Sequence, residues 1–256
     1  MYKFLLKPRW IAFHLLCLAT IVAMINLAFW QLRRLDEKRT FNDRVTAHTD
    51  ADVVPLNANL LLGDLDDLIY RRVELTGTYV ADHQFTIVGV AQDGSNGTDA
   101  VNALQLADGS LVIVNRGFIA DGSSVPPAPS GTVQLIGRLK RSQVAGTGEP
   151  SDDGSQQLTQ IRRVDLRALR QQFDLPVLPM YVELLQSEPK EPATVKPVAF
   201  PTLDEGPHLS YTVQWFIFSI CVAAGWVFAV RKSARTRAGI AKPKRKKTPP
   251  ILDPHP

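Results

Sequence analysis

The residues of this chain best suited to holding a ligand are His208 and the aromatic residues that follow it. Pro207 suits the first turn of a helix, where its missing N–H is not needed, so the sequence predicts that His208 begins a helix. Tyr211, Thr212 and Trp215 then share one face with it, at i+3, i+4 and i+7. An imidazole beside aromatic rings is a side-chain set that ligates haem iron. The simpler interpretation is a polar helix start followed by the aromatic residues usual at a membrane surface.

A second candidate group is the arginine pair Arg33 and Arg34, which follows a long apolar segment at 10–30. Guanidinium groups there can pair with acidic lipid, with a carboxylate of a partner protein or with haem propionates. Asn26, earlier on a similar helical face, is expected to hydrogen-bond across a pair of helices. His14 differs in depth from His208 by about sixteen helical residues, or roughly 24 Å. These two histidines are therefore not expected to hold the same metal ion.

Two apolar segments must position these residues. The stretches 10–30 and 211–230 are each about twenty residues long and contain no Asp, Glu, Lys or Arg. At about 1.5 Å per residue, each spans roughly 30 Å as a helix, which is the thickness of the hydrocarbon core of a bilayer. The average composition, 45% apolar and 21% charged, is that of a soluble protein, but its uneven distribution excludes a soluble single domain. We therefore predict transmembrane helices at 10–30 and 208–230.

Charge is distributed in three zones along the chain. Residues 1–9 carry three cations, and residues 231–256 carry nine Lys or Arg against one Asp, so the two ends sum to +11. The whole chain is +4, which leaves −7 for residues 31–210. By the positive-inside rule, both termini are expected in the cytoplasm and the middle segment outside. The run 10–30 is too long for a signal peptide, and nine residues before it are too few for a mitochondrial transit peptide, so a bacterial plasma membrane is expected.

The middle segment is predicted to be mostly β. The first helix should continue past the membrane surface to Val45, and residues 49–67 have the composition of loops. Alternating apolar and polar residues predict strands, and Asp108-Gly109 predicts a hairpin turn. Asp165 is a candidate N-cap for a short helix at 166–173. The predicted strands are 70–80, 85–90, 101–106, 111–118, 132–139 and 180–185.

The expected fold class is a membrane protein with two transmembrane α-helices flanking a mainly β (α+β) extracytoplasmic domain. Residues 186–207 contain five prolines and are expected to form an extended strap that returns the chain to the membrane. Cys17 and Cys221 both lie in the apolar segments, which leaves the outer domain without a thiol. The predicted divisions are a cytoplasmic N-terminus at 1–9, transmembrane helix 1 at 10–30, the outer domain at 31–185, the strap at 186–207, transmembrane helix 2 at 208–230 and a basic cytoplasmic tail at 231–256.

Signatures of known catalytic sites are missing from the sequence. It has no Gly-x-Ser-x-Gly, no His-Glu-x-x-His and no Walker-type loop, so we do not expect an enzyme. Residues 93–99 lack the ligand spacing of a calcium loop and are expected to form a solvated turn. His48, His83 and His255 stand in polar sequence and are expected to be exposed. The basic run 242–247 is better explained by membrane orientation and contact with anionic lipid than by nucleic-acid binding.

Ordered blocks of residues run across nearly the whole chain. They are Trp30-Gln31-Leu32-Arg33-Arg34-Leu35 with Lys38, Arg72-Val73 to Gly77-Thr78-Tyr79, Val114-Asn115-Arg116-Gly117-Phe118, Gly137-Arg138-Leu139, and Pro207-His208-Leu209-Ser210-Tyr211 to Gln214-Trp215-Phe216. In this order, and with two apolar spans, they resemble the Surfeit locus protein one family of cytochrome c oxidase assembly factors. The chain departs from that family at Gln105-Leu106, where a Pro-Leu pair is frequent, and at Phe118, where Trp is usual.

The resemblance implies a respiratory-chain assembly chaperone, which assists haem a insertion into haem–copper oxidase or stabilises an immature oxidase subunit at the outer membrane surface. Some bacterial members are thought to bind haem through a histidine at the position of His208. The resemblance therefore implies transient haem a binding, with His208 as iron ligand and Tyr211, Trp215, Arg33 and Arg34 lining the contact. Oxidase subunits and membrane lipid are the expected partners. Two other classes stay open: a two-span cell-surface scaffold, such as a polysaccharide chain-length regulator, and a membrane-anchored enzyme of unrecognised type.

Overall fold

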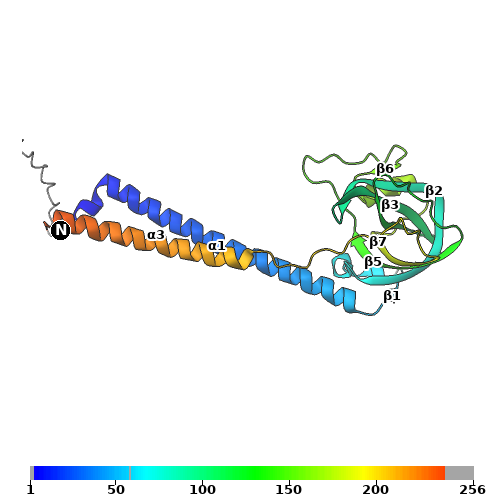
Figure 1. Ribbon diagram of the computed structural model, residues 1–256, viewed down its shortest axis with the longest axis horizontal. Helices are drawn as coiled ribbons and strands as arrows, with labels where there is room; N and C mark the ends of the chain where they lie inside the picture. The colour runs from blue at the N-terminus through cyan, green and yellow to red at the C-terminus, as the bar shows by residue number, and fades with distance from the viewer. Residues whose placement is uncertain (1–2, 58, 240–256) are drawn as a thin grey trace, which may run out of the picture. The chain divides into compact units, whose positions relative to one another are not determined.

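The computed structural model describes residues 3–57 and 59–239, which divide into two compact units (Figure 1). The helical unit holds the described residues up to Thr40 and from Asp204 onward, and the β unit runs from Phe41 to Leu203. The helical unit contains η1 (Lys3–Leu6), most of α1 (Pro8–Asp50) and α3 (His208–Arg237). The last residues of α1, from Phe41 to Asp50, belong to the β unit.

Helices α1 and α3 are both long and apolar enough to cross a membrane. Their most apolar stretches have mean hydropathies of 2.2 and 2.0, and only 11% and 6% of these stretches are buried inside the chain. A core helix of a soluble protein would bury its apolar side chains, whereas these remain exposed. The two predicted apolar helices are thus confirmed, although α1 and α3 extend beyond 10–30 and 208–230 at their ends.

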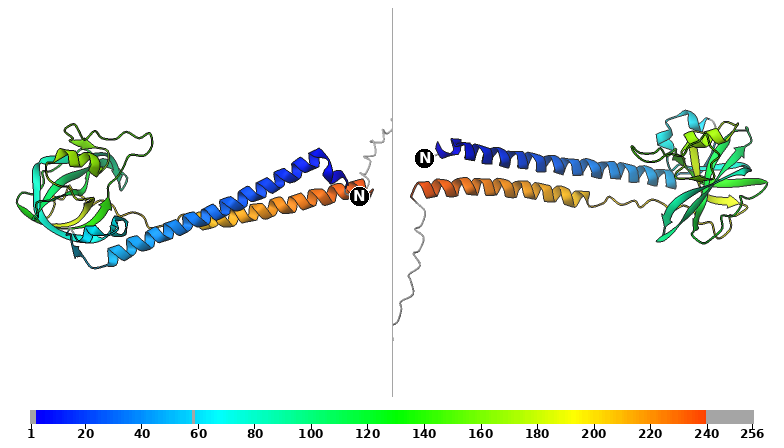
Figure 2. Two further views of the ribbon diagram at one scale, coloured as in Figure 1. Left: turned by 180° about the vertical axis from the view of Figure 1, so that it is seen from behind. Right: turned by 90° about the horizontal axis from the view of Figure 1, so that it is seen from above.

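The two long helices pack against each other in antiparallel directions (Figure 2). His14 near the start of α1 contacts Trp226 late in α3, and the ring of Phe29 lies edge-on to that of Phe216, with centroids 5.9 Å apart. Small buried residues on the facing sides allow close approach of the two backbones, as is usual for apolar helices; they include Ala28, Thr212, Ser219 and Ala234. The prediction for Asn26 is wrong, because its amide donates to the Val22 carbonyl within α1.

The β unit is built around a closed barrel. Strand β2 pairs with β3 along most of its length and with β5 along its first residues, so that the sheet returns to its starting strand. Closure leaves parts of β2 open, and two short strands, at 54–55 and 160–161, pair with β2 there. All barrel pairings are antiparallel except the short one between β4 and β7. The barrel strands, in order around the sheet, are β2 (Arg72–Gln92), β3 (Ser95–Leu106), β4 (Leu111–Ala120), β7 (Met180–Glu188) and β5 (Thr132–Arg141).

Short elements pack against the barrel or pair with β2. Asp165 caps a short helix as predicted, accepting a hydrogen bond from the Arg167 N–H, but α2 ends at Leu169 and the chain continues as a 3-10 turn. Apolar residues of α2 pack with Phe85 and Ile113 into one buried cluster, and a second cluster fills the barrel beside β5 and β7. The short elements are β1 (Val54–Pro55), η2 (Leu60–Leu62), η3 (Leu65–Leu68), β6 (Gln160–Ile161), α2 (Leu166–Leu169) and η4 (Arg170–Gln172).

Two tight turns connect β2 to β3 and β3 to β4. The predicted hairpin at Asp108-Gly109 is confirmed, with φ of 83° at Gly109 and the Asp108 carboxylate accepting from Ser110. The predicted solvated turn over 93–99 is confirmed only at its start, because residues 95–99 belong to a strand. Asp93 and Gly94 alone make the turn, with φ of 51° and 77°, and β3 begins at the next residue. Positive φ at both positions matches the right-handed twist of a two-residue hairpin.

The proline-rich strap is bonded to the barrel rather than free. Strand β7 continues to Glu188, so the extended segment begins three residues later than predicted. The backbones of Lys196 and Phe118 exchange two hydrogen bonds, of 2.7 and 2.8 Å. This close approach requires glycine at 117, where φ is 141° and a Cβ would lie 2.3 Å from the Lys196 carbonyl oxygen. The strap therefore belongs to the folded β unit at this point.

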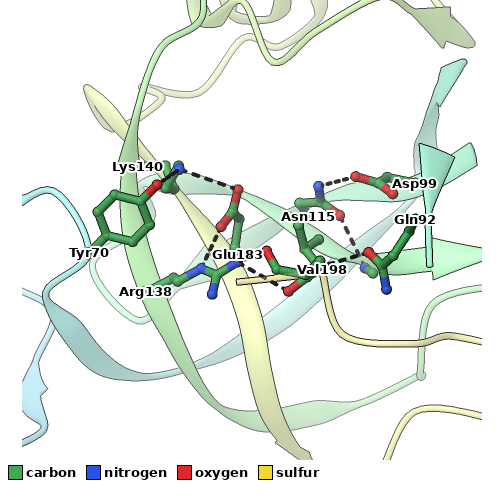
Figure 3. A network of polar contacts seen from close by, with 10 residues as sticks. Tyr70, Gln92, Asp99, Asn115, Arg138, Lys140, Glu183 and Val198 are labelled. Carbon is green, nitrogen blue, oxygen red and sulfur yellow. Dashed lines mark hydrogen bonds and ion pairs between the residues drawn. The ribbon is translucent and has the colours of Figure 1, made fainter. Parts of the chain in front are cut away.

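A buried ion pair fixes the end of the strap (Figure 3). Arg138 on β5 and Glu183 on β7 lie 2.6 Å apart, and their side chains are only 4% and 8% exposed. The same guanidinium donates to the carbonyls of Val198 and Ala199, at 3.1 and 2.9 Å. Lys140 lies 3.8 Å from the other Glu183 oxygen. Since the guanidinium bonds both the barrel and the strap, the pair holds these two parts of the chain together.

A second buried carboxylate lies in the same polar region. Asn115 on β4 donates to one oxygen of Asp99 on β3, at 2.7 Å. The other oxygen is buried and has no hydrogen-bond partner among the described residues. Burial raises the pKa of Asp99, and the nearby charge of Glu183 raises it further, whereas the bond from Asn115 lowers it. Asp99 therefore makes the folded state less stable when it is ionised.

Glu183→Gln should lower the free energy of unfolding by about 3 to 5 kcal/mol, because it leaves the buried Arg138 charge without a counterion. Asp66→Asn is the matched control in the same unit, since it breaks an exposed ion pair with Arg141 and should cost at most about 1 kcal/mol. Denaturant unfolding of the full chain in detergent, followed by circular dichroism, measures both. Equal losses for the two variants would contradict a structural role of the buried pair.

Asp99→Asn should raise the stability at pH 7 by about 1 kcal/mol, because it removes a buried charge and keeps an oxygen to accept from Asn115. A carboxyl whose pKa is raised by folding costs stability as the pH rises from about 4, the pKa of an unfolded Asp, through its folded value. Thermal unfolding across this range should therefore show a decline in the parent chain that the variant lacks. Asp108→Asn is the control, because hydrogen bonds from Ser110 lower the pKa of that exposed carboxyl.

Candidate functional site

The imidazole of His208 is held in a defined orientation at the start of α3. Its Nδ1 lies 2.7 Å from the Oε1 of Gln31 on α1, and the side chain is half-buried. An amide oxygen can only accept, so Nδ1 donates its proton to Gln31. The other ring nitrogen, Nε2, then carries the lone pair. This is one of the two neutral tautomers in which histidine ligates a metal, with the remaining N–H bonded to an oxygen.

The turn before α3 sets the position of this ring. Gly206 has φ of 65°, a conformation that favours glycine, and Pro207 precedes the first helical residue. The predicted helical face is only partly available to a ligand. Thr212 is buried and donates to the His208 carbonyl, whereas Tyr211 is 46% exposed and Trp215 is half-buried. Of the predicted face, the side chains of Tyr211 and Trp215 therefore remain at least partly exposed.

The predicted arginine pair is not brought to His208 by any contact in the described part of the chain. Arg33 and Arg34 are both exposed, and Arg34 forms an ion pair with Glu37 one turn further along α1. A contact that the sequence did not reveal lies one turn beyond. Arg39 makes two hydrogen bonds of 2.9 Å to Glu205, just before α3, and these bonds lower the pKa of Glu205. This exposed pair joins the two chain segments that carry Gln31 and His208.

Two further histidines, His48 and His83, have structural contacts. The predictions of exposure for His48 and His83 are wrong, since both are half-buried. His48 lies 2.7 Å from the Ile69 carbonyl oxygen, and the ring of His83 lies on Phe173 with centroids 4.7 Å apart. His255 lies outside the described residues. Within residues 3–57 and 59–239, no group of three or more His, Cys, Asp or Glu could hold a metal ion.

The β unit contains a cavity of about 940 Å³, bordered by β2, β5, β7 and the strap. Charged side chains of both signs line it, namely Glu74, Arg116, Glu188, Lys190 and Glu191. The side chain of Arg116 is fully buried and forms two hydrogen bonds to Glu191, of 3.0 and 2.7 Å. The remaining guanidinium hydrogens go to Asn102 and to the carbonyls of Pro126 and Pro127. All five N–H groups are thus used, so Arg116 offers no donor to a ligand in this conformation.

Burial also affects the protonation state of Tyr79, the tyrosine beside Arg116. The guanidinium of Arg116 lies 5.8 Å from the ring centre of Tyr79. Burial, followed by the charge of Glu191, raises the pKa of the Tyr79 hydroxyl, so this phenol is neutral at physiological pH. A neutral phenol and a fully paired arginine are features of a packed interior. Among the described residues, the imidazole of His208 is the better candidate for ligand chemistry.

Comparison with known proteins shows similarity over the part of the chain that contains these residues. The SURF1 family profile matches residues 18–220, which include Gln31, His208 and the whole barrel. Uncharacterized SURF1-like proteins of Mycobacterium tuberculosis and Mycobacterium bovis are 31% identical over 259 residues, covering 96% of this chain and 93% of theirs. Surfeit locus protein 1 of Takifugu rubripes is 23% identical, covering 79% of this chain and 90% of its own. With most of its length matched in this way, the chain belongs to the SURF1 family.

Proposed function

We propose that the protein is a membrane-anchored assembly factor for haem–copper cytochrome c oxidase. In this role it binds haem a transiently as cargo, or stabilises an immature oxidase subunit, at the outer membrane surface. Membership of the SURF1 family supports the oxidase connection, because the resemblance of the chain to that family implies such a role. A carrier function needs a binding surface rather than a catalytic group. The imidazole of His208, held by Gln31, could form part of such a surface.

The proposed topology places α1 and α3 across a bacterial plasma membrane, with both termini in the cytoplasm and the β unit outside. The exposed apolar side chains of both helices support insertion, because they would otherwise contact water. The charge difference between the +11 termini and the −7 middle segment supports the orientation. In this arrangement His208 and Gln31 lie at the outer end of the helical unit.

The observation that carries the haem hypothesis is the hydrogen bond between Gln31 and His208. It places the proton on Nδ1, which leaves Nε2 in the state required to ligate iron. Tyr211 and Trp215 would contact the macrocycle, and the exposed guanidinium of Arg33 would pair with a propionate. Arg34 would do so only by giving up its bond to Glu37. A single imidazole ligand at an exposed helix end suits a group that must later be released.

The two other classes have less support. A polysaccharide chain-length regulator would carry an outer domain rich in long helices, whereas the unit from Phe41 to Leu203 is built on a β-barrel. A membrane-anchored enzyme would need a nucleophile or base within reach of a substrate. His48 and His83, the histidines of the described β unit, are directed to a backbone carbonyl and an aromatic ring instead.

Deletion of the gene should lower cytochrome c oxidase activity and the haem a content of the membranes, and the intact chain should restore both. The purified protein, made in cells that synthesise haem a, should show a Soret band that His208→Ala removes, because the variant lacks the iron ligand. Tyr211→Phe is the control, since it keeps the ring beside the site. An unchanged spectrum in His208→Ala would exclude the ligand role, while normal oxidase activity after deletion would exclude the assembly role.

Gln31→Leu should weaken haem binding by about tenfold or more, because it removes the acceptor that fixes the proton on Nδ1. Gln31→Glu keeps an oxygen at this position and should preserve binding, with a shift of the Soret maximum caused by the more basic imidazole. Haem titration of the purified variants, read from the absorption spectrum, separates the two effects. Equal binding by Gln31→Leu and the parent chain would show that Gln31 does not position His208 for a ligand.

A further inference from the structure

A second cavity lies at the other end of the helical unit from His208, where α1 begins and α3 ends. Its volume is about 510 Å³, and apolar atoms make up most of its walls. It is lined by Leu5, His14, Trp226, Val227, Val230 and Arg231. The cavity therefore combines an apolar slot with two polar side chains, which is the pattern of a site for an amphipathic molecule.

The hydrogen bond of His14 determines which nitrogen of its ring carries the proton. The indole Nε1–H of Trp226 donates to Nδ1 of His14, at 2.7 Å. Because Nδ1 accepts this bond, the proton of the neutral imidazole is on Nε2. His14 is thus a hydrogen-bond donor, the opposite of His208, and its tautomer disfavours iron ligation. A ligand at this site should present an acceptor such as a phosphate oxygen.

The wall beside the cavity is well packed. Phe4 of η1 is buried, with its ring edge-on to Trp10 at 5.1 Å and the guanidinium of Arg237 at 4.5 Å from its centre. Trp10 in turn lies 5.7 Å from the ring of His14. These contacts fix η1, which supplies Leu5, against both long helices. The cavity is therefore bounded by ordered side chains from three elements.

The charge around the cavity is of one sign. The segments 3–9 and 231–237, which flank it, contain no Asp or Glu. Arg231 lines the cavity itself, and it is exposed. Further exposed cations lie on the same two segments: Lys7, Arg9, Lys232, Arg235 and Arg237. Basic pockets at the cytoplasmic ends of transmembrane helices attract anionic lipid headgroups, so the charge complements a phosphate.

We propose that this cavity binds one anionic phospholipid. Arg231 and the Nε2–H of His14 hold the phosphate, and an acyl chain lies along Val227 and Val230. This site rests on the proposed membrane anchoring of α1 and α3, but it is independent of the haem hypothesis at His208. It would give the inner end of the helical unit a specific lipid partner.

Native mass spectrometry of the full chain in mild detergent tests the proposal by titration with phosphatidylglycerol or with phosphatidylcholine. We expect retention of one phosphatidylglycerol at concentrations where phosphatidylcholine is not retained. Arg231→Gln should weaken this binding by about fivefold, whereas Lys232→Gln, which removes an adjacent cation outside the cavity, should have little effect. Val227→Trp should abolish retention by filling the slot, and Phe228→Trp is its control, since Phe228 is exposed and does not line the cavity.

Three results would overturn the site: equal retention of both lipids, equal effects of Arg231→Gln and Lys232→Gln, or saturable binding of inorganic phosphate alone in place of lipid. Alkaline carbonate extraction of membranes is run beside these titrations. Release of the protein by carbonate would contradict membrane anchoring itself, whereas an integral protein without lipid preference would contradict only the lipid site. Oxidase activity in the Arg231→Gln strain reports separately on the assembly function.

Discussion

The barrel depends on the double pairing of one long strand. Because β2 bonds to β5 at its start and to β3 along the rest, the sheet closes on itself. Closure also creates an interior in which polar groups must find partners within the chain. Arg116 and Arg138 meet this requirement with partners from the strap, namely Glu191 and the carbonyls of Val198 and Ala199. The strap is therefore required to complete the interior of the barrel.

The helical unit differs from the barrel because it has little buried apolar interior of its own. Most of its apolar side chains are not covered by other parts of the chain. Packing between α1 and α3 therefore relies on small residues and on a few hydrogen bonds near the two ends of the helix pair. These end contacts join residues that are far apart in sequence and fix two histidines in defined orientations. The unit thus has these two polar contacts near the ends of its apolar segments.

Much of this architecture could be predicted from local sequence patterns. The two apolar helices, the hairpin at Asp108-Gly109 and the cap at Asp165 depend on neighbouring residues, and the structure confirms them. The continuity of β2 could not be predicted, because the polar stretch between its apolar parts coincides with a register shift between Tyr79 and Gln84. The early start of β3 was missed because Asp93-Gly94 lies in a polar stretch that is also typical of a solvated loop.

The candidate site was only partly predictable for a related reason. His208 stood out through its type and its position after Pro207, but its partner Gln31 is 177 residues away and no local signal marks it. The two arginines were placed near His208 by depth alone, whereas Arg34 instead pairs with Glu37 on its own helix. Buried pairs such as Arg116 with Glu191 depend in the same way on closure of the chain. Such contacts are set by tertiary structure rather than by periodicity.

The opposite tautomers at the two ends of the helical unit have a consequence for selectivity. An amide oxygen facing Nδ1 leaves an electron pair on Nε2 of His208, whereas an indole N–H facing Nδ1 leaves an N–H on Nε2 of His14. The end with His208 should therefore select ligands that present a Lewis-acidic metal centre. The end with His14 should select ligands that present a negatively charged oxygen. A molecule suited to one end is thereby disfavoured at the other, although both ends carry the same residue type in different tautomers.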